Sequence, residues 1–318
     1  MQVSGDAIRF GVHSGPQNTT FEDYRDLWLR CEELGYDWVS DFDHFYPIYS
    51  DPAGQQFEGL TLLSAMAAHT SRVRCGMLVL GVTYRHPAVV AKTAATIDHV
   101  SGGRLELGMG AAWFELEHEQ YGIPFPRIGV RMDMLDEACR IMRSLWTQET
   151  TTFEGRHFQL KDAHLEPKPV QAHLPLVIGG AGERRTLRIV AEHGDIWNTF
   201  FGDVDEYRHK LDVLAGHCAD VGRDPADVRR SLTFRALLDE DEQTARKRAA
   251  ELYGDPLPER LQRMMVVGTP EQCVGQLRPY ADLGVGDFLL GQLAPVDQRT
   301  IELVADSVAP ALKAAVAA

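Results

Sequence analysis

The feature that most constrains this chain is the regular alternation of short apolar segments with segments of helical periodicity. Eight segments are apolar enough to be buried parallel strands, and each is followed by a predicted helix. The predicted strands cover residues 8–13, 37–40, 73–80, 104–110, 176–178, 195–198, 231–237 and 287–290. Such alternation favours a parallel sheet with right-handed crossovers. The sequence therefore predicts one α/β domain over residues 1–318, a (β/α)8 TIM barrel with insertion regions.

A doubly wound open sheet is the structural alternative. That fold usually carries a G-x-G-x-x-G motif after its first strand, but here the strand ends in His13-Ser14-Gly15-Pro16. We therefore favour the barrel. The expected insertions are the connection 41–58, the excursion 111–127 and a hairpin within 151–160. A helix and a variable stretch follow between residues 241 and 264.

The composition of the chain limits the kinds of molecule that it is expected to bind. The formal net charge of −14 argues against binding to a nucleic-acid backbone. No apolar run is long enough to span a membrane, and the first residues do not resemble a secretory signal. The five cysteines lie far apart and form no C-x-x-C pair, which fits reduced thiols in the cytoplasm. The twelve histidines form no convincing metal cluster, so we expect no metal and a small-molecule substrate.

A polar segment follows the second predicted strand. Ser40-Asp41-Phe42-Asp43-His44-Phe45-Tyr46-Pro47 places two carboxylates, a histidine and three aromatic side chains where a barrel strand ends. That end of a parallel barrel carries the chemistry. We expect His44 to hydrogen-bond the reacting part of a ligand, with a carboxylate fixing its tautomer. The alternative is a structural histidine held by Asp41 or Asp43.

A glycine-rich segment follows the fifth predicted strand. Gly179-Gly180-Ala181-Gly182 leads into a helix, and Arg184 and Arg185 lie next to it. Glycines let a backbone approach a phosphate closely, and a helix N-terminus attracts anions. We therefore favour a phosphate-binding turn over a tight turn with no ligand, although Glu183 counts against it. Gly108-Met109-Gly110 is a weaker signal, because it lacks the third glycine of a dinucleotide motif.

Other catalytic motifs are absent from the sequence. There is no G-x-S-x-G, no cysteine beside a histidine and no Walker motif, so acyl and phosphoryl transfer lack support. A cofactor with a phosphate tail fits the pattern better, since it would supply the chemistry while the protein orients it.

Several segments together resemble one family. They are residues 40–47, 83–88, 95–110, 117–126, 153–158, 166–171, 179–182 and 194–198, and they span nearly the whole chain. With these segments the chain resembles the luciferase-like family of flavin and deazaflavin oxidoreductases. It is most similar to the branch that uses coenzyme F420, a 5-deazaflavin that carries hydride.

The resemblance implies specific site residues. His44 matches the histidine that contacts the deazaflavin ring, and we expect it to act in catalysis together with Asp43. Leu78 and Val79 match a cis peptide that forms a bulge behind the ring. The remaining cofactor contacts implied by the resemblance are Asp41, Gly110, Ala111 and the phosphate seat Gly179, Gly180, Ala181 and Gly182. Because the cofactor tail is anionic, we expect a local basic rim from Arg184, Arg185 and Lys168.

Two departures from the family pattern bear on the reaction. Sugar-phosphate and alcohol dehydrogenases of the family carry a tryptophan four residues after the histidine, whereas this chain has Ile48 there. Those dehydrogenases also carry an acidic residue after the fourth strand, at a position that aligns with Trp113 of this chain. We therefore expect reduction of an activated double bond or ring rather than alcohol oxidation. An FMN-dependent two-component monooxygenase is the first alternative, and a non-catalytic flavin-binding barrel is the second. A homodimer is the default expectation for assembly.

Overall fold

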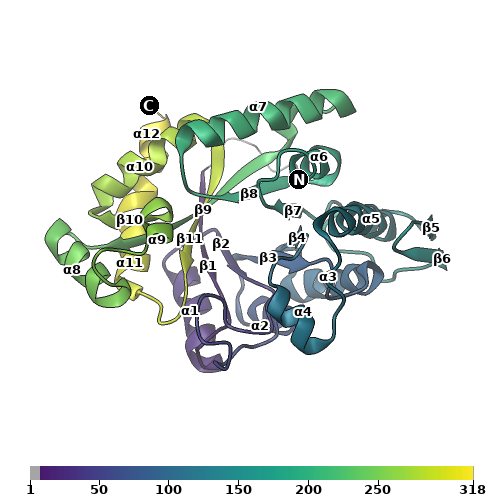
Figure 1. The fold of residues 1–318 in the computed structure, drawn as a ribbon, viewed down its shortest axis with the longest axis horizontal. Helices are drawn as coiled ribbons and strands as arrows, with labels where there is room; N and C mark the ends of the chain where they lie inside the picture. Colours follow the sequence, from purple (N-terminus) through teal and green to yellow (C-terminus); the bar gives the residue numbers. More distant parts are fainter. Residues whose placement is uncertain (1–7, 318) are drawn as a thin grey trace.

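Eight parallel strands close into a barrel in the computed structural model, which describes residues 8–317 (Figure 1). The strands run in the order β1, β2, β3, β4, β7, β8, β9 and β11, and β11 pairs with β1 to complete the ring. Their bounds are β1 (Arg9–Ser14), β2 (Trp38–Asp41), β3 (Arg74–Gly81), β4 (Leu105–Gly110), β7 (Leu176–Gly179), β8 (Ile196–Phe200), β9 (Arg229–Leu238) and β11 (Val285–Gln292). The predicted (β/α)8 barrel is confirmed.

Helices surround the barrel, and their termini follow from local sequence. Thr20 caps the first helix by accepting from the amide of Asp23, while Pro87 begins the third helix in its first turn. Gly102, with φ of 64°, ends that third helix in the left-handed conformation. The helices over the strands are α1 (Phe21–Glu33), α2 (Gly59–His69), α3 (Pro87–Ser101), α5 (Ile128–Thr147), α6 (Thr186–His193), α7 (Val204–Val221), α10 (Pro270–Asp282), α11 (Gln298–Leu303) and α12 (Ala309–Ala317), with a π-helical turn over Val304–Val308.

The insertions add smaller elements to this frame. The predicted hairpin forms as β5 (Thr151–Glu154) and β6 (Gln159–Ala163), at the edge of the molecule beyond α5 (Figure 1). The excursion after β4 contains a short helix, α4 (Glu115–Tyr121), that the sequence did not predict. The stretch before residue 264 forms α8 (Glu242–Tyr253) and α9 (Glu259–Met264), and a short 3-10 turn covers Pro225–Asp227. A ninth strand, β10 (Met265–Gly268), pairs with the second half of β9 and was also not predicted.

Apolar side chains fill both the inside of the barrel and the layer beneath the helices. Five strands and no helix contribute to one buried cluster, which is the arrangement expected for a barrel interior. Its members are Trp38, Leu78, Val177, Ile196 and Leu289. The larger cluster joins strands to helices and includes Trp28, Leu63, Met142, Leu176 and Phe288. All five cysteines are buried free thiols, as the sequence indicated.

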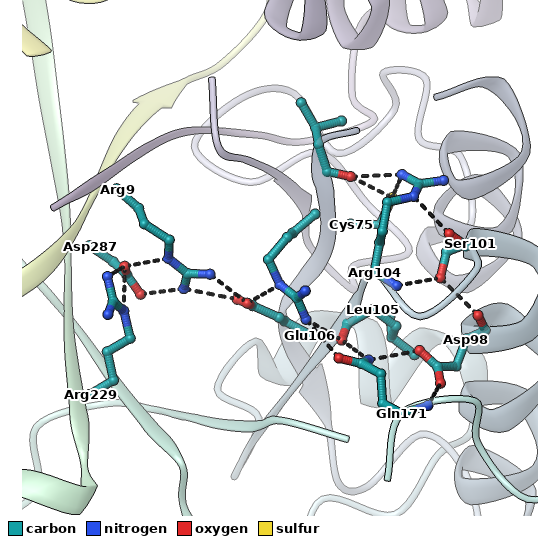
Figure 2. A network of polar contacts seen from close by, with 12 residues as sticks. Arg9, Cys75, Asp98, Ser101, Arg104, Leu105, Glu106, Gln171, Arg229 and Asp287 are labelled. Atoms are coloured by element: carbon teal, nitrogen blue, oxygen red, sulfur yellow. Dashed lines mark hydrogen bonds and ion pairs between the residues drawn. The ribbon is translucent and has the colours of Figure 1, made fainter. Parts of the chain in front are cut away.

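A network of charged side chains closes the end of the barrel where the strands begin (Figure 2). Arg9 on β1 donates two hydrogen bonds of 2.7 Å to Asp287 on β11 and one of 2.8 Å to Glu106 on β4. Since β1 and β4 are not neighbours in the sheet, Arg9 spans the barrel interior. Arg229 and Arg74 also pair with these carboxylates, each of which is 1% exposed. Guanidinium groups therefore compensate both buried charges.

The same end of the barrel holds the segment 166–171 that contributed to the family resemblance. Gln171 donates to Asp98 on α3 at 2.7 Å and accepts from Arg74 at 2.9 Å (Figure 2). Lys168 donates to the carbonyl oxygen of Leu145, near the C-terminus of α5, at 2.9 Å. The expectation that Lys168 lies on a basic rim beside the glycine turn is therefore wrong. The ammonium instead stabilises a helix end, where the dipole favours a cation.

We predict that Asp287→Asn lowers the free energy of unfolding by roughly 3–5 kcal/mol, because it leaves Arg9 and Arg229 without their buried counter-charge. Urea unfolding measures the change. Glu259→Gln is the control, since the exposed pair between Glu259 and Arg263 should contribute at most about 1 kcal/mol. Equal effects of the two variants would contradict a special role for the network.

Candidate active site

His44 lies in the loop after β2, at the end of the barrel where the strands finish. Its Nδ1 atom is 3.0 Å and 3.1 Å from the two carboxylate oxygens of Glu117, a side chain on α4. Because a carboxylate only accepts, Nδ1 carries the proton in this contact. Among residues 8–317, the structure records hydrogen bonds of His44 at Nδ1 alone, which leaves Nε2 available to a ligand.

Glu117 is a completely buried side chain that binds more than the histidine. It accepts hydrogen bonds from the amides of Phe45 and Tyr46, at 2.7 Å and 3.0 Å, and from the hydroxyl of Tyr84. Burial alone would raise the pKa of Glu117, but the hydrogen bonds from His44, Tyr84 and Tyr46 outweigh it and lower the pKa. Glu117 therefore stays ionised and fixes both the loop and the imidazole.

Asp43 has a different partner from the one expected. Its carboxylate accepts from Arg85 at 2.7 Å and 2.9 Å and from the amide of Gly81 at 3.1 Å. Arg85 also pairs with Glu58, at the start of α2. Burial raises the pKa of Asp43, although Arg85 offsets part of that effect. The alternative that Asp41 or Asp43 holds His44 is wrong, and Asp43 instead anchors the loop to the end of β3.

Asp41 lies apart from this arrangement. Its neighbour Ser40 hydrogen-bonds His13 at 3.0 Å, and Trp38 belongs to the interior cluster, so strand alternation places Asp41 on the outer face of β2. Both carboxylate oxygens are buried without a hydrogen-bond partner among the described residues. Burial, with the nearby charges of Asp43 and Glu58, raises the pKa of Asp41 well above its usual value. The structure therefore does not bring Asp41 to the inner face with His44.

The side chain of Val79 restricts three positions on neighbouring strands to glycine. The peptide between Leu78 and Val79 is cis, as the family resemblance implies, and the register of β3 against β4 shifts at this point. A β-carbon added at Gly110, Gly108 or Gly179 would lie 2.6, 2.7 or 2.9 Å from a methyl group of Val79, and at Gly108 the carbonyl oxygen of Met77 would be closer still, at 2.1 Å. These distances are too short for any side chain. Glycines on β4 and β7 are therefore required by the bulge itself.

Part of the turn after β7 is hydrogen-bonded within the protein. Gly180 adopts a φ of 116°, donates its amide to the carbonyl of Asn198 at 3.0 Å, and accepts from Trp197 Nε1 at 2.8 Å. The following residues, Ala181 and Gly182, lead to α6, whose N-terminus has no side-chain cap. Of the two arginines expected at a basic rim, Arg185 pairs with Asp133 at 2.5 Å, while Arg184 is exposed. The site retains uncapped helix amides that suit an anion.

The sequence interpretation missed three residues that build this site. Glu117, Tyr84 and Arg85 all lie within segments that carried the family resemblance, but nothing in their spacing marked them as partners of the 43–46 loop. Gly110 ends β4 beside Val79, and Ala111 directly follows the strand. His44 and the turn at 179–182 both follow parallel strands of a closed barrel, so they share one end of it.

Other kinds of site are less developed in the described part of the chain. Over residues 8–317, no helix combines the length and apolar character needed to cross a bilayer. One cluster, Asp136, Glu192 and His193 on α5 and α6, has donor spacing suited to a metal ion. His193 already hydrogen-bonds Asp136 at 2.8 Å, so these groups satisfy one another.

The structure is a closed parallel α/β barrel with a bulge within its third strand and a carboxylate-held histidine after its second. A family model of luciferase-like monooxygenases matches residues 6–260. The chain therefore belongs to the luciferase-like monooxygenase family.

Individual relatives cover almost the whole chain. An F420-dependent glucose-6-phosphate dehydrogenase of Amycolatopsis mediterranei (strain U-32) is 27% identical, over 96% of this chain and 99% of its own length. A solved F420-dependent secondary alcohol dehydrogenase, in complex with an F420-acetone adduct, has a TM-score of 0.84 at 22% identity, covering 96% of this chain and 99% of that chain. The EDTA monooxygenase of Chelativorans sp. BNC1 has a TM-score of 0.82 at 15% identity, with 96% and 94% covered.

We predict that Gly179→Ala lowers the free energy of unfolding by about 1–3 kcal/mol, because its methyl group overlaps Val79. Combining it with Val79→Ala should cost less than the sum of the two single variants, by at least about 0.5 kcal/mol. Denaturant unfolding of all three proteins gives this coupling. Gly216→Ala in α7, where the added methyl group meets no atom within 4 Å, is the control. A neutral Gly179→Ala would show that Val79 does not require this glycine.

We predict that His13 makes the protein less stable in mild acid. Burial, Arg235 and His44 lower the pKa of His13 from 6.5 to about 4. As pH falls from 6.5 towards 4, the unfolded chain binds a proton that the native protein does not, so the free energy of unfolding falls. His13→Gln should reduce this dependence, measured by urea unfolding across that range. His69→Gln, an exposed helix-end substitution, should leave it unchanged.

Proposed function

We propose that this protein is an oxidoreductase that transfers a hydride between coenzyme F420 and a small organic substrate. The observation that carries the proposal is the imidazole of His44, fixed through Nδ1 by buried Glu117 at the same end of the barrel as the Val79 bulge. The F420-dependent relatives named above support the choice of cofactor. His44 is the proposed catalytic residue, while Asp43 positions its loop through Arg85.

The residues present fit a flat ring joined to an anionic tail. Val79 occupies the bed formed by glycines of β4 and β7, so it presents a smooth apolar surface next to the cis peptide. The uncapped start of α6 offers amides to a phosphate. Leu78, Val79, Gly110 and Ala111 would hold the ring, and the turn at 179–182 would hold the tail. Asp41, on the outer face of β2, is not part of this proposal.

The deazaflavin, when bound, supplies or accepts a hydride. The chain's own contribution is orientation and control of one proton. With Nδ1–H donated to Glu117, the Nε2 atom of His44 accepts a hydrogen bond from a ligand. When Nε2 carries a proton, it donates to the ligand instead. His44 can therefore deliver the proton that accompanies a hydride.

Reduction fits the site better than alcohol oxidation. An alcohol must lose a proton as its hydride leaves, and Nε2 of His44 can accept it, but the dehydrogenases of the family carry an acidic residue as well. Glu117 and Asp43 are both occupied by several hydrogen-bond donors, and Glu58 is paired with Arg85 and capped onto α2. Trp113 occupies the position that we aligned with an acidic residue of the family dehydrogenases. We therefore propose an activated double bond or an electron-poor ring as the group that is reduced.

An FMN-dependent two-component monooxygenase is the second candidate, because the family is named for monooxygenases and the EDTA monooxygenase shares the fold. A non-catalytic flavin-binding barrel is the third. A cytoplasmic homodimer also remains a prediction.

We expect separate titrations of the purified protein to show that oxidised F420 binds more tightly than FMN. With reduced F420 and 2-cyclohexenone as an activated double bond, His44→Ala should lower kcat by roughly 100-fold or more. Glu117→Gln keeps the shape of the side chain and should shift the pH profile of kcat. Leu252→Ala, an exposed change on α8, is the control. Binding of FMN alone, with oxygen consumption by the reduced form, would refute the proposal in favour of a monooxygenase.

A further inference from the structure

Two large exposed aromatic side chains, one of them in contact with His44, lie at the mouth of the barrel. Trp113 is 52% exposed and Tyr49 is 59% exposed, although they come from separate loops after β4 and β2. Their rings stack with centroids 5.9 Å apart and an angle of 18°. Trp113 also stacks on Phe114, with 5.1 Å between centroids and the same angle. Three nearly parallel rings therefore form one row, which we call the aromatic row.

The aromatic row borders the proposed catalytic imidazole. The His44 ring lies 5.4 Å from the Trp113 ring and 5.9 Å from the Phe114 ring, in each case edge-on. Phe42 contacts His44 from a third direction at 5.3 Å. The immediate surroundings of the imidazole are thus aromatic on several sides, with Glu117 as its hydrogen-bonded partner.

Two residues that position the aromatic row have an unfavourable backbone conformation. Tyr49 has a φ of 58°, and Ala112, which directly precedes Trp113, has a φ of 59°. A bulky side chain rarely adopts the left-handed region, and each such residue costs of order 1 kcal/mol. Strained residues of this kind concentrate at ligand-binding sites. Two loops are therefore strained at the points where they present exposed rings.

Packing alone does not account for this exposure. The other tryptophans, Trp28, Trp38, Trp146 and Trp197, are at most 6% exposed. An indole that only served the core would be buried in the same way, because burial of aromatic surface is strongly favourable. Here half of the Trp113 surface faces outward while the backbone is held in an unfavourable conformation. The arrangement is suited to a further ring added against the row.

We propose that the aromatic row is the substrate platform and that it selects uncharged, planar, electron-poor ring compounds of the quinone class. The exposed aromatic surface of Tyr49 and Trp113 is electron-rich and stacks well on an electron-poor ring. Arg85, in the connection after β3, is neutralised by Asp43 and Glu58 and so offers little charge to a sugar phosphate. This inference rests on the proposed function: one hydride from the reduced deazaflavin and one proton added to a quinone give the hydroquinone and the oxidised cofactor.

Menadione is a suitable probe, and binding can be measured without turnover. Because Trp113 is the one exposed tryptophan of the five in the chain, its fluorescence should be quenched saturably by menadione. We expect calorimetry to show that Trp113→Ala and Tyr49→Ala each weaken binding roughly tenfold or more, about 1.4 kcal/mol by the standard conversion. Trp113→Phe should retain most of the affinity, and Leu252→Ala all of it.

The substitution Tyr49→Gly separates the platform from simple packing. Glycine adopts a positive φ without strain, so Tyr49→Gly should melt at a higher temperature than Tyr49→Ala while binding menadione as weakly. In turnover with reduced F420, Trp113→Ala should raise the KM for menadione by roughly tenfold and that for 2-cyclohexenone less than about twofold.

Calorimetry is run both without cofactor and with oxidised F420, so that a failure of the cofactor proposal is distinguishable from a failure of the platform. If F420 does not bind, the proposed function fails, but the menadione titration of the protein alone still tests the row. Affinity that is unchanged in Trp113→Ala, or no saturable menadione binding under either condition, overturns the platform inference.

Discussion

The carboxylate of Glu117 is the interaction on which the mouth of the barrel depends. It receives a ring N–H from His44, two backbone amides from the same loop and the hydroxyl of Tyr84. These donors come from the connections after β2 and β3, while Glu117 itself lies on the inserted helix α4. One buried charge thus joins three loops that are far apart in the chain. Because each donor compensates part of its desolvation, the carboxylate remains ionised and the loops remain fixed.

The two ends of the barrel use charge in opposite ways. Where the strands begin, Asp287 and Glu106 are paired with guanidinium groups of the protein itself (Figure 2). Where the strands end, His44 retains a ring nitrogen that can bind a ligand, and exposed rings lie on strained backbone. Barrels of this type generally separate stability from chemistry in this way. The ion pairs where the strands begin therefore hold the barrel closed, while the loops where the strands end carry the strained residues.

The strands could be predicted because each is a short apolar run, and a run of this kind needs no distant information to be recognised. The partner of His44 could not be predicted in this way. Asp41 and Asp43 are close in sequence, but Glu117 is 73 residues away, and only the folded α4 brings it near. The glycines at 179–182 suggested a phosphate, whereas Gly179, like Gly108 and Gly110 on β4, lies against Val79 on β3. Lys168 appeared to be part of a basic rim because charge in a sequence carries no information about which end of a barrel it occupies.

Trp113, at the position that we align with an acidic residue of the family dehydrogenases, bears on more than one contact. A dehydrogenase site keeps a base for the departing proton and needs polar surroundings for a hydroxylated substrate. In this chain, Glu117, Asp43 and Glu58 are all held by donors of the protein itself. The loop that follows β4 then contributes an indole next to the imidazole, and Tyr49 extends that surface. His44 keeps one free ring nitrogen, but the lack of a free carboxylate and the added aromatic surface act in the same direction. Both disfavour a polar alcohol and favour a flat acceptor that needs only a hydride and one proton.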